Sequence, residues 1–212
     1  MAIKNTPQFL RAAFDAALKT ADPQAMLPDG LSKVFSAPLK GRCLVLGAGK
    51  AAASMAVALE QYAQQNWPEA KLEGVVITRY GHNLPTKTIQ VIEAGHPVPD
   101  EAGLNGAKET LRLIRTLQPG DQLIALISGG GSSLLTLPAP GLSIQDLQVT
   151  TQALLMSGAP IGQMNIVRKH LSAILGGHMA REAAARGAKV DAFLISDVTG
   201  AVSYTHLTLP TN

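Results

Sequence analysis

Three glycines and three serines follow the apolar run LIALI, in a stretch that reads ISGGGSSLL from Ile127 to Leu135. Glycine lets the backbone bend so that successive amide hydrogens point into one concavity, and serine hydroxyls add further donors. Such a cradle suits the oxygens of a phosphate or a carboxylate, although a flexible loop without a ligand has the same composition. No Gly-Lys-Ser/Thr triplet follows, so this is not a Walker A loop, and a neutralising cation must come from elsewhere. The candidate anion-binding residues are Ser128, Gly129, Gly130, Gly131, Ser132 and Ser133.

A second glycine turn supplies a candidate cation. Gly47, Gly49 and Ala52 have the spacing G-x-G-x-x-A after an apolar run, close to the dinucleotide fingerprint, and Lys50 adds a full positive charge. The next strand ends in the sequence RYGH and offers no carboxylate for a ribose. We therefore predict that Gly47, Gly49 and Lys50 bind phosphate. A turn that only lets a helix pack closely on a strand is the alternative.

A third predicted strand, AFLI, is followed by Asp197 in the sequence SDVTG. A carboxylate at this position could hold Mg²⁺ through water, orient a substrate hydroxyl or act as a base. It could equally cap the following turn.

Polar residues also recur at helical spacing in the stretch NIVRKHLS. They are Asn165, Arg168, Lys169 and Ser172. The pattern i, i+3, i+4, i+7 places them on one helix face, with Ile166, Leu171 and Ile174 available for the buried face. That polar face either points toward the anion cradle or is simply solvated.

The loop EAGHPVPDEAG carries His96 and Asp100. Asp100 is expected to cap the helix that follows it, and His96 is interpreted as a hydrogen-bonded loop residue rather than a ligand. The five histidines show no metal-binding spacing, so we predict no protein-ligated metal site.

The overall composition favours a small anionic ligand over a macromolecular one. A hydrophobic fraction of 46% and a charged fraction of 16% are typical of a globular α/β protein. The net charge is only +3, the basic residues are scattered and aromatic residues make up 4%, which argues against a nucleic-acid surface. A single cysteine, Cys43, excludes an internal disulfide. No apolar run is long enough for a secretory signal or a membrane span, so we expect a cytoplasmic protein.

The predicted elements alternate between helices and strands. A first helix is expected from Thr6 and Pro7, as N-cap and first helical residue, and a loop over 21–41. Strands are expected at 74–81, 88–95, 121–128 and 190–197, and helical segments at 100–117, 143–158 and 161–187. A strand, glycine turn and helix are expected over 42–65. The continuous apolar strands predict a Rossmann-like, doubly wound, mostly parallel sheet with helices on both faces.

Six motifs in this order resemble the N-terminal domain of the class II glycerate 2-kinases, some of whose members carry the label hydroxypyruvate reductase. They are LVLGAGKAA, GVVITRYGH, EAGHPVPDEAG, LISGGGSSLL, MSGAPIGQMNIVRKHLSAILGG and FLISDVTG, and the match runs from about Phe9 to Gly200. The resemblance implies ATP- and Mg²⁺-dependent phosphorylation of D-glycerate at its 2-hydroxyl, in a cleft between this domain and a smaller C-terminal α/β domain. It makes Lys50 the leading catalytic candidate. Asn165, Arg168, Lys169 and Asp197 follow as further site residues.

Two other functions stay open. A nicotinamide-dependent hydroxypyruvate reductase would use the G-x-G turn, with Arg79 meeting a 2′-phosphate, but would leave the second glycine loop without a role. A non-catalytic anion-binding module would bind a ligand without turnover. Each of the three functions implies a small-molecule partner, and none requires nucleic acid or a membrane.

The chain departs from the family after residue 200. We expect an acidic, proline-containing continuation there and then the second domain, but the chain reads AVSYTHLTLPTN. We therefore expect residues 1–200 to be an incomplete kinase domain, little active alone.

Residues 201–212 resemble translated adapter sequence, and we predict that they are not native. Sequencing the genomic locus by an independent method checks this, and finding these codons there in frame would contradict it.

Overall fold

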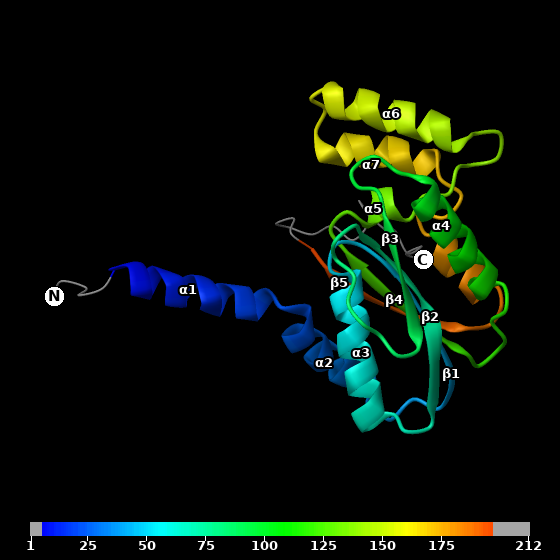
Figure 1. Cartoon of the computed structure of the whole chain (residues 1–212). Coiled ribbons are helices and arrows are strands. Elements are labelled where there is room, and N and C mark those ends of the chain that lie inside the picture. The colour runs from blue at the N-terminus through cyan, green and yellow to red at the C-terminus, as the bar shows by residue number, and fades with distance from the viewer. Residues whose placement is uncertain (1–5, 197–212) are drawn as a thin grey trace.

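Five parallel strands form the central sheet of the computed structural model, which describes residues 6–196 (Figure 1). They are β1 Gly41–Ala48, β2 Ala70–Arg79, β3 Ile89–Ala94, β4 Gln122–Ser128 and β5 Lys189–Ile195. Their order across the sheet is β3-β2-β1-β4-β5, so the chain crosses over between β3 and β4. Every residue of β4 is buried, as expected for a strand covered on both faces. The predicted doubly wound α/β fold is confirmed.

Helices cover both faces of this sheet and enclose two separate cores. On one face, α2 (Pro23–Val34) and α3 (Ala52–Asn66) bury residues such as Leu31, Met55 and Leu126. On the other, α4 (Glu101–Ile114) and α8 (His178–Ala184) bury residues such as Ile77 and Leu123. The strands therefore present apolar side chains in both directions, and their carboxyl ends are held in fixed register.

The segment 21–41, which was predicted to be a loop, contains helix α2, so that prediction was wrong. Asp22 caps the helix by accepting a 2.9 Å hydrogen bond from the amide of Gln24, and Pro23 occupies the first turn, where its missing N–H costs nothing. Leu27 and Leu31 are one turn apart and are both buried. Their burial outweighs the helix-breaking tendency of Pro28 inside the helix.

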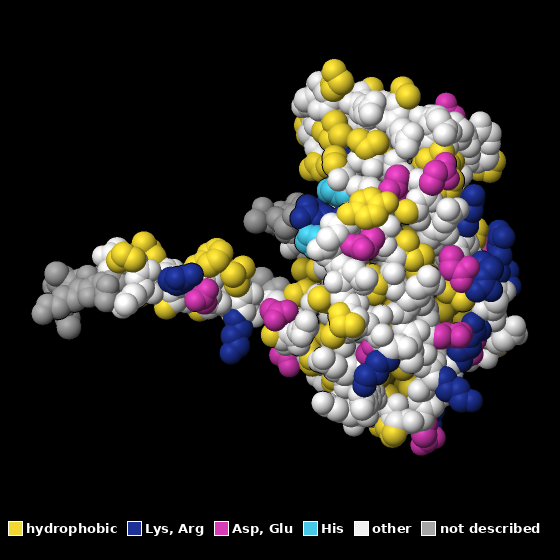
Figure 2. All heavy atoms as spheres, viewed as in Figure 1, with side chains coloured by type: hydrophobic (Ala, Val, Ile, Leu, Met, Phe, Trp, Pro, Cys, Tyr) yellow, Lys and Arg dark blue, Asp and Glu magenta, His cyan; other side chains and the backbone are white. Residues whose placement is uncertain are grey.

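The first helix, α1 (Thr6–Ala21), projects away from the sheet (Figure 1). Its apolar stripe is not buried: Phe9, Leu10, Phe14 and Leu18 are each more than half exposed. Figure 2 shows this stripe as a row of hydrophobic side chains along the projecting helix.

Three further helices lie at the carboxyl edge of the sheet. They are α5 (Gly131–Leu134), α6 (Ile144–Met156) and α7 (Ile161–His170), with α6 and α7 side by side in Figure 1. The Gln148 amide of α6 donates a 2.8 Å hydrogen bond to the Pro99 carbonyl, which ties this pair to the loop after β3.

The predicted helical segment 161–187 is divided between α7 and α8. Ser172 Oγ accepts the amide hydrogens of Ile174 and Leu175, and the backbone of Gly176 and Gly177 is left-handed, so no continuous helix is possible there. Within residues 6–196 no helix is both long enough and apolar enough to cross a bilayer.

Candidate anion-binding site

The carboxyl ends of β1 and β4 lie side by side at the point where the strand order reverses. The register pairs Ala48 with Ile127, so the two glycine loops begin next to each other. Ligands of open α/β sheets bind at this position. The two loops predicted from sequence therefore form one candidate site.

The turn after β1 packs directly against the end of β4. A Cβ atom at Gly49 would lie 2.1 Å from Ser128 Oγ and 2.6 Å from the Ser128 carbonyl oxygen, and the backbone φ there is +140°. A Cβ atom at Gly47 would lie 2.4 Å from the Leu126 carbonyl oxygen. Only glycine fits at these two positions, so the structure gives both a packing role.

The backbone amides of this turn donate hydrogen bonds to other groups of the protein. Gly49 N–H donates to the Ile77 carbonyl, Lys50 N–H to the Gly129 carbonyl and Ala51 N–H to Ser128 Oγ, all at 2.9 to 3.0 Å. These groups are therefore not free to hold a pyrophosphate in the dinucleotide manner. Phosphate contact by Gly47 and Gly49 stays a prediction, and the side chain of Lys50 is what this turn offers to a ligand.

The serine hydroxyls of the loop after β4 differ in their hydrogen bonds and in their surroundings. Ser128 Oγ accepts from the turn after β1, and Ser133 Oγ donates to the Gly130 carbonyl at 3.0 Å. Ser132 is half-buried and lines a pocket. The backbone of Gly130 is left-handed, with φ +86°, and Gly130 is the N-cap of the short helix α5, in which the amides of Ser133 and Leu134 donate to the Gly130 carbonyl.

His96 and Lys50 meet above Gly130. A Cβ atom built on Gly130 would lie 2.7 Å from His96 Nε2 and 3.6 Å from Lys50 Cε. Three segments, following β1, β3 and β4, therefore converge on one glycine. Sequence reasoning placed His96 in a loop and did not include it among the site residues. Its position directly after β3, at the edge shared with the two glycine loops, was the signal that could have identified it.

The site is strongly cationic. Burial lowers the pKa of His96, and the nearby charges of Lys50, Arg79 and Arg168 lower it further. Figure 2 shows histidine side chains beside a lysine or arginine below the α6 and α7 pair. His96 is therefore neutral at pH 7, while the surrounding field favours an anion.

The carboxylate of Asp100, in the same loop as His96, already accepts hydrogen bonds from within the protein. Asp100 caps α4 through the Gly103 amide at 3.0 Å, as predicted, and accepts a 2.8 Å hydrogen bond from the Tyr80 hydroxyl. Burial alone would raise the pKa of Asp100, but these donors hold it below its usual value.

Asn165, Arg168 and Lys169 lie on one face of α7, as their spacing predicts, and this face is turned toward the protein rather than toward solvent. Asn165 is buried, Arg168 lines the pocket that contains Ser132, and Lys169 lines a neighbouring groove. Ile166, which was expected on the buried face, is 53% exposed, so that expectation was wrong.

Asp197 lies outside the described residues, so its predicted role stays a prediction. Within residues 6–196, no group of three or more His, Cys, Asp or Glu side chains is placed to hold a metal ion.

A pair of glycine substitutions tests the convergence above Gly130. Gly130→Ala and Gly120→Ala both place a side chain on left-handed backbone, with φ of +86° and +93°, and each should lower the free energy of unfolding by about 1–2 kcal/mol. Nothing lies within 4 Å of a Cβ at Gly120. Only Gly130→Ala should therefore shift the NMR resonances of the His96 ring. Equal effects of both substitutions on His96 would contradict the arrangement.

The pKa of His96 gives a second test by NMR titration, with His96→Gln to assign the resonance. Lys50→Met should raise that pKa by removing a neighbouring positive charge, whereas Lys87→Met, at the opposite edge of the sheet, should not change it. Because the folded pKa lies below the unfolded one, the unfolded state binds more protons between the two values. The contribution of His96 to stability is thus complete above its usual pKa and is lost as the pH falls toward the folded pKa. If acidification through this pH range raised the free energy of unfolding of the wild type but not that of His96→Gln, the predicted direction of the pH dependence would be contradicted.

Comparison with known proteins gives the family. The sequence profile of a domain of unknown function, DUF4147, matches residues 9–204. A glycerate 2-kinase of Pyrococcus horikoshii is 44% identical over 162 residues, covering 76% of this chain and 35% of that protein. A protein of Agrobacterium vitis, named for a proposed hydroxypyruvate reductase activity, is 49% identical over 193 residues, covering 91% of this chain and 42% of that protein.

A solved structure agrees with these sequence matches. The crystal structure of glycerate kinase from Thermotoga maritima superposes with a TM-score of 0.76 at 37% identity, covering 93% of this chain and 47% of that one. The chain thus spans less than half the length of these relatives. It belongs to the DUF4147 family, the glycerate kinase family that its sequence motifs resemble.

Proposed function

We propose that this chain provides a nucleotide- and substrate-binding domain of a kinase that transfers the γ-phosphoryl group of ATP to the 2-hydroxyl of D-glycerate. The products would be 2-phosphoglycerate and ADP. The observation that carries the proposal is the convergence of Lys50 and His96 on Gly130, at the carboxyl edge between β1 and β4. The names of the relatives supply the substrate class.

Phosphoryl transfer needs positioning and charge stabilisation more than covalent chemistry by the protein. Lys50 is exposed at the site and can neutralise charge on the phosphoryl oxygens. The bent backbone around Gly130 and the start of α5 offers amide donors. His96, neutral at pH 7, adds no charge and can accept a hydrogen bond from a substrate hydroxyl.

Mg²⁺ fits this site only when a bound nucleotide supplies ligands to it. The described residues near Lys50 are donors and cations, not a cage of carboxylates, so phosphate oxygens would have to supply most of the ligands. When bound in this way, the ion would neutralise charge that develops on the transferred group. We propose Asp197 as the protein group that approaches it.

Three features of the structure favour a kinase over the nicotinamide-dependent reductase. The amides of the G-x-G turn donate to the Ile77 and Gly129 carbonyls, so they are not free for a pyrophosphate. Arg79, the candidate for a 2′-phosphate, donates a 2.6 Å hydrogen bond from Nε to His82 Nε2. The loop after β4, which a reductase would leave without a task, lies beside Lys50 in the site.

We further propose that the 212-residue chain alone turns over little. Its relatives are more than twice as long as the part matched here. A domain that closes over the open carboxyl edge would exclude water and complete the cleft.

The test uses the protein encoded by the complete gene, with D-glycerate, ATP and Mg²⁺, followed by identification of the phosphoglycerate isomer. Formation of 2-phosphoglycerate is expected. Lys50→Ala should lower kcat/KM by about 10²- to 10³-fold because it removes charge stabilisation of the transition state. Lys87→Ala, an exposed lysine whose Nζ donates to Gln64, is the control and should be near wild type.

Three results separate the alternatives, with thermal unfolding used to confirm that each variant is folded. Absence of phosphorylated product together with NADPH consumption on hydroxypyruvate would establish the reductase. Saturable ligand binding without any turnover would establish the non-catalytic module. Product formed equally well by wild type and Lys50→Ala would remove Lys50 from the mechanism.

A further inference from the structure

Arg168 carries an uncompensated charge in a partly enclosed position. Its Nε atom is buried and has no hydrogen-bond partner within residues 6–196, and no ion pair joins the guanidinium to another described residue. Burial lowers the pKa of Arg168, which shows that the surroundings do not fully replace water around the charge. A buried donor without an acceptor destabilises the folded protein. A ligand that supplied an acceptor would remove this destabilisation.

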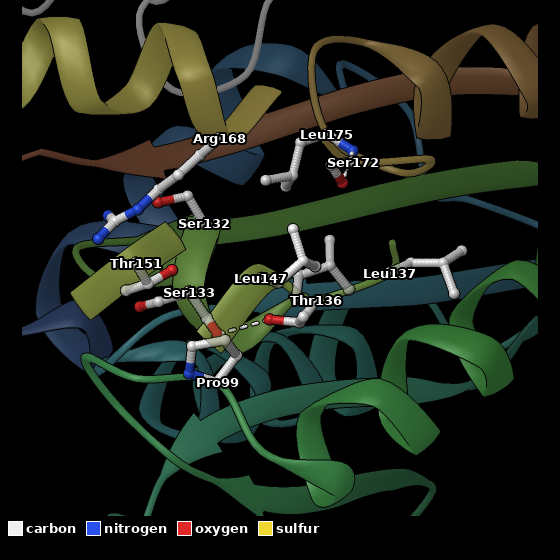
Figure 3. Close-up of a pocket in the computed structure, with 11 residues that line it drawn as sticks. Pro99, Ser132, Ser133, Thr136, Leu137, Leu147, Thr151, Arg168, Ser172 and Leu175 are labelled. Atoms are coloured by element: carbon white, nitrogen blue, oxygen red, sulfur yellow. Dashed lines mark hydrogen bonds between the residues drawn. The ribbon is translucent and has the colours of Figure 1, made fainter. Parts of the chain in front are cut away.

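The pocket beside Arg168 has hydroxyl donors at one end and apolar walls elsewhere. Figure 3 shows the guanidinium on the same side as the hydroxyls of Ser132, Ser133 and Thr151. Leu135 and Leu147 are among the apolar residues that line the rest. Apolar walls lower the local dielectric constant, so an anion that entered would interact with Arg168 more strongly than at the open surface.

The size of this pocket restricts the ligand. Its volume is about 30 Å³, which holds a group of a few atoms but not a nucleoside. A carboxylate has that size and is planar, so it matches the two-pronged donor geometry of a guanidinium. A phosphoryl group is larger, and the more open region around Lys50 and Gly130 suits it better.

We propose that the Arg168 pocket binds the carboxylate of the small substrate, with Ser132 and Thr151 as supporting hydroxyls. The proposal rests on the proposed function, because it assigns the two ends of one substrate to two parts of the same site. Arg168 is close enough to His96 for its charge to act on that ring, and His96 lies above Gly130 next to Lys50. If the carboxylate of a three-carbon acid is held at Arg168, the rest of the acid points toward Lys50 and Gly130, where the phosphoryl group is proposed to bind. Arg168 would then determine specificity for acids over neutral polyols.

The first experiment measures binding to this chain by ligand-observed NMR. The probes are D-glycerate and its neutral amide, D-glyceramide, which differ only in the group assigned to Arg168. Arg168→Gln should weaken binding of D-glycerate by about 10- to 100-fold, the size expected for hydrogen bonds to a charged group. Binding of the amide should change less than about twofold. Arg168→Lys, which keeps the charge but loses the two-pronged geometry, should fall between.

The matched control is Arg11→Gln, which removes the same charge from an exposed position on α1. It should leave binding of both probes at the wild-type level. An equal loss of glycerate and amide binding in Arg168→Gln would show that Arg168 only supports the structure, and would overturn the proposal.

The second experiment uses the protein of the complete gene and separates carboxylate from phosphate. Arg168→Gln should raise the KM for D-glycerate about 10- to 100-fold while the KM for ATP changes less than about twofold. A rise confined to the KM for ATP would assign Arg168 to the nucleotide and overturn the proposal.

Failure of the proposed function is a separate outcome. If wild type binds D-lactate or hydroxypyruvate instead of D-glycerate, and Arg168→Gln weakens these acids but not their amides, the carboxylate pocket stands and the glycerate kinase assignment falls. If wild type binds no small carboxylate at all, the pocket assignment falls as well.

Discussion

The turn after β1 and the end of β4 touch without room for one methyl group between them. This contact depends on Gly49, whose hydrogen faces Ser128, and on Ser128 Oγ, which receives the amide hydrogen of Ala51. Lys50 follows at once, and its side chain is exposed. The position of the lysine charge is therefore set by backbone contacts between two distant segments, including the hydrogen bond from Lys50 N–H to the Gly129 carbonyl.

Cationic side chains lie near this contact, whereas the neighbouring carboxylates accept hydrogen bonds from other parts of the protein. Asp100 serves the amino end of α4, and Glu93 accepts the Gly81 amide hydrogen at 2.6 Å. Lys50 and Arg168 belong to no ion pair among residues 6–196. An ion-pair network at this edge would have stabilised the domain without a ligand. Its absence from the described part of the chain leaves a local field that a small anion can satisfy.

Sequence patterns predicted the strands well, because each has an apolar run that only a doubly covered sheet can bury. They failed where tertiary burial competes with local propensity. The prolines and glycines of 21–41 indicated a loop, yet the burial of Leu27 and Leu31 makes part of this segment a helix. The two glycine loops were found from composition. His96 was not selected, because nothing local distinguishes it from an ordinary loop histidine; only the parallel sheet brings it to Gly130. On α7 the helical spacing grouped Asn165, Arg168 and Lys169 correctly, but it did not show that this polar face is turned inward and Ile166 outward.

The order of the strands also determines when the chain can complete this edge during synthesis on a ribosome. The central strand β1 pairs with β2, which follows soon after it, but its other neighbour joins through pairs as distant as Cys43 and Gln122. Until β4 emerges, one side of β1 keeps unpaired backbone groups and an apolar surface, the kind of edge on which nascent chains aggregate. Closing so long a loop is slow compared with forming local structure. The half containing β1, β2, β3 and α3 is thus expected to form first. The anion site proposed at this edge is then complete only after β4 has paired with β1.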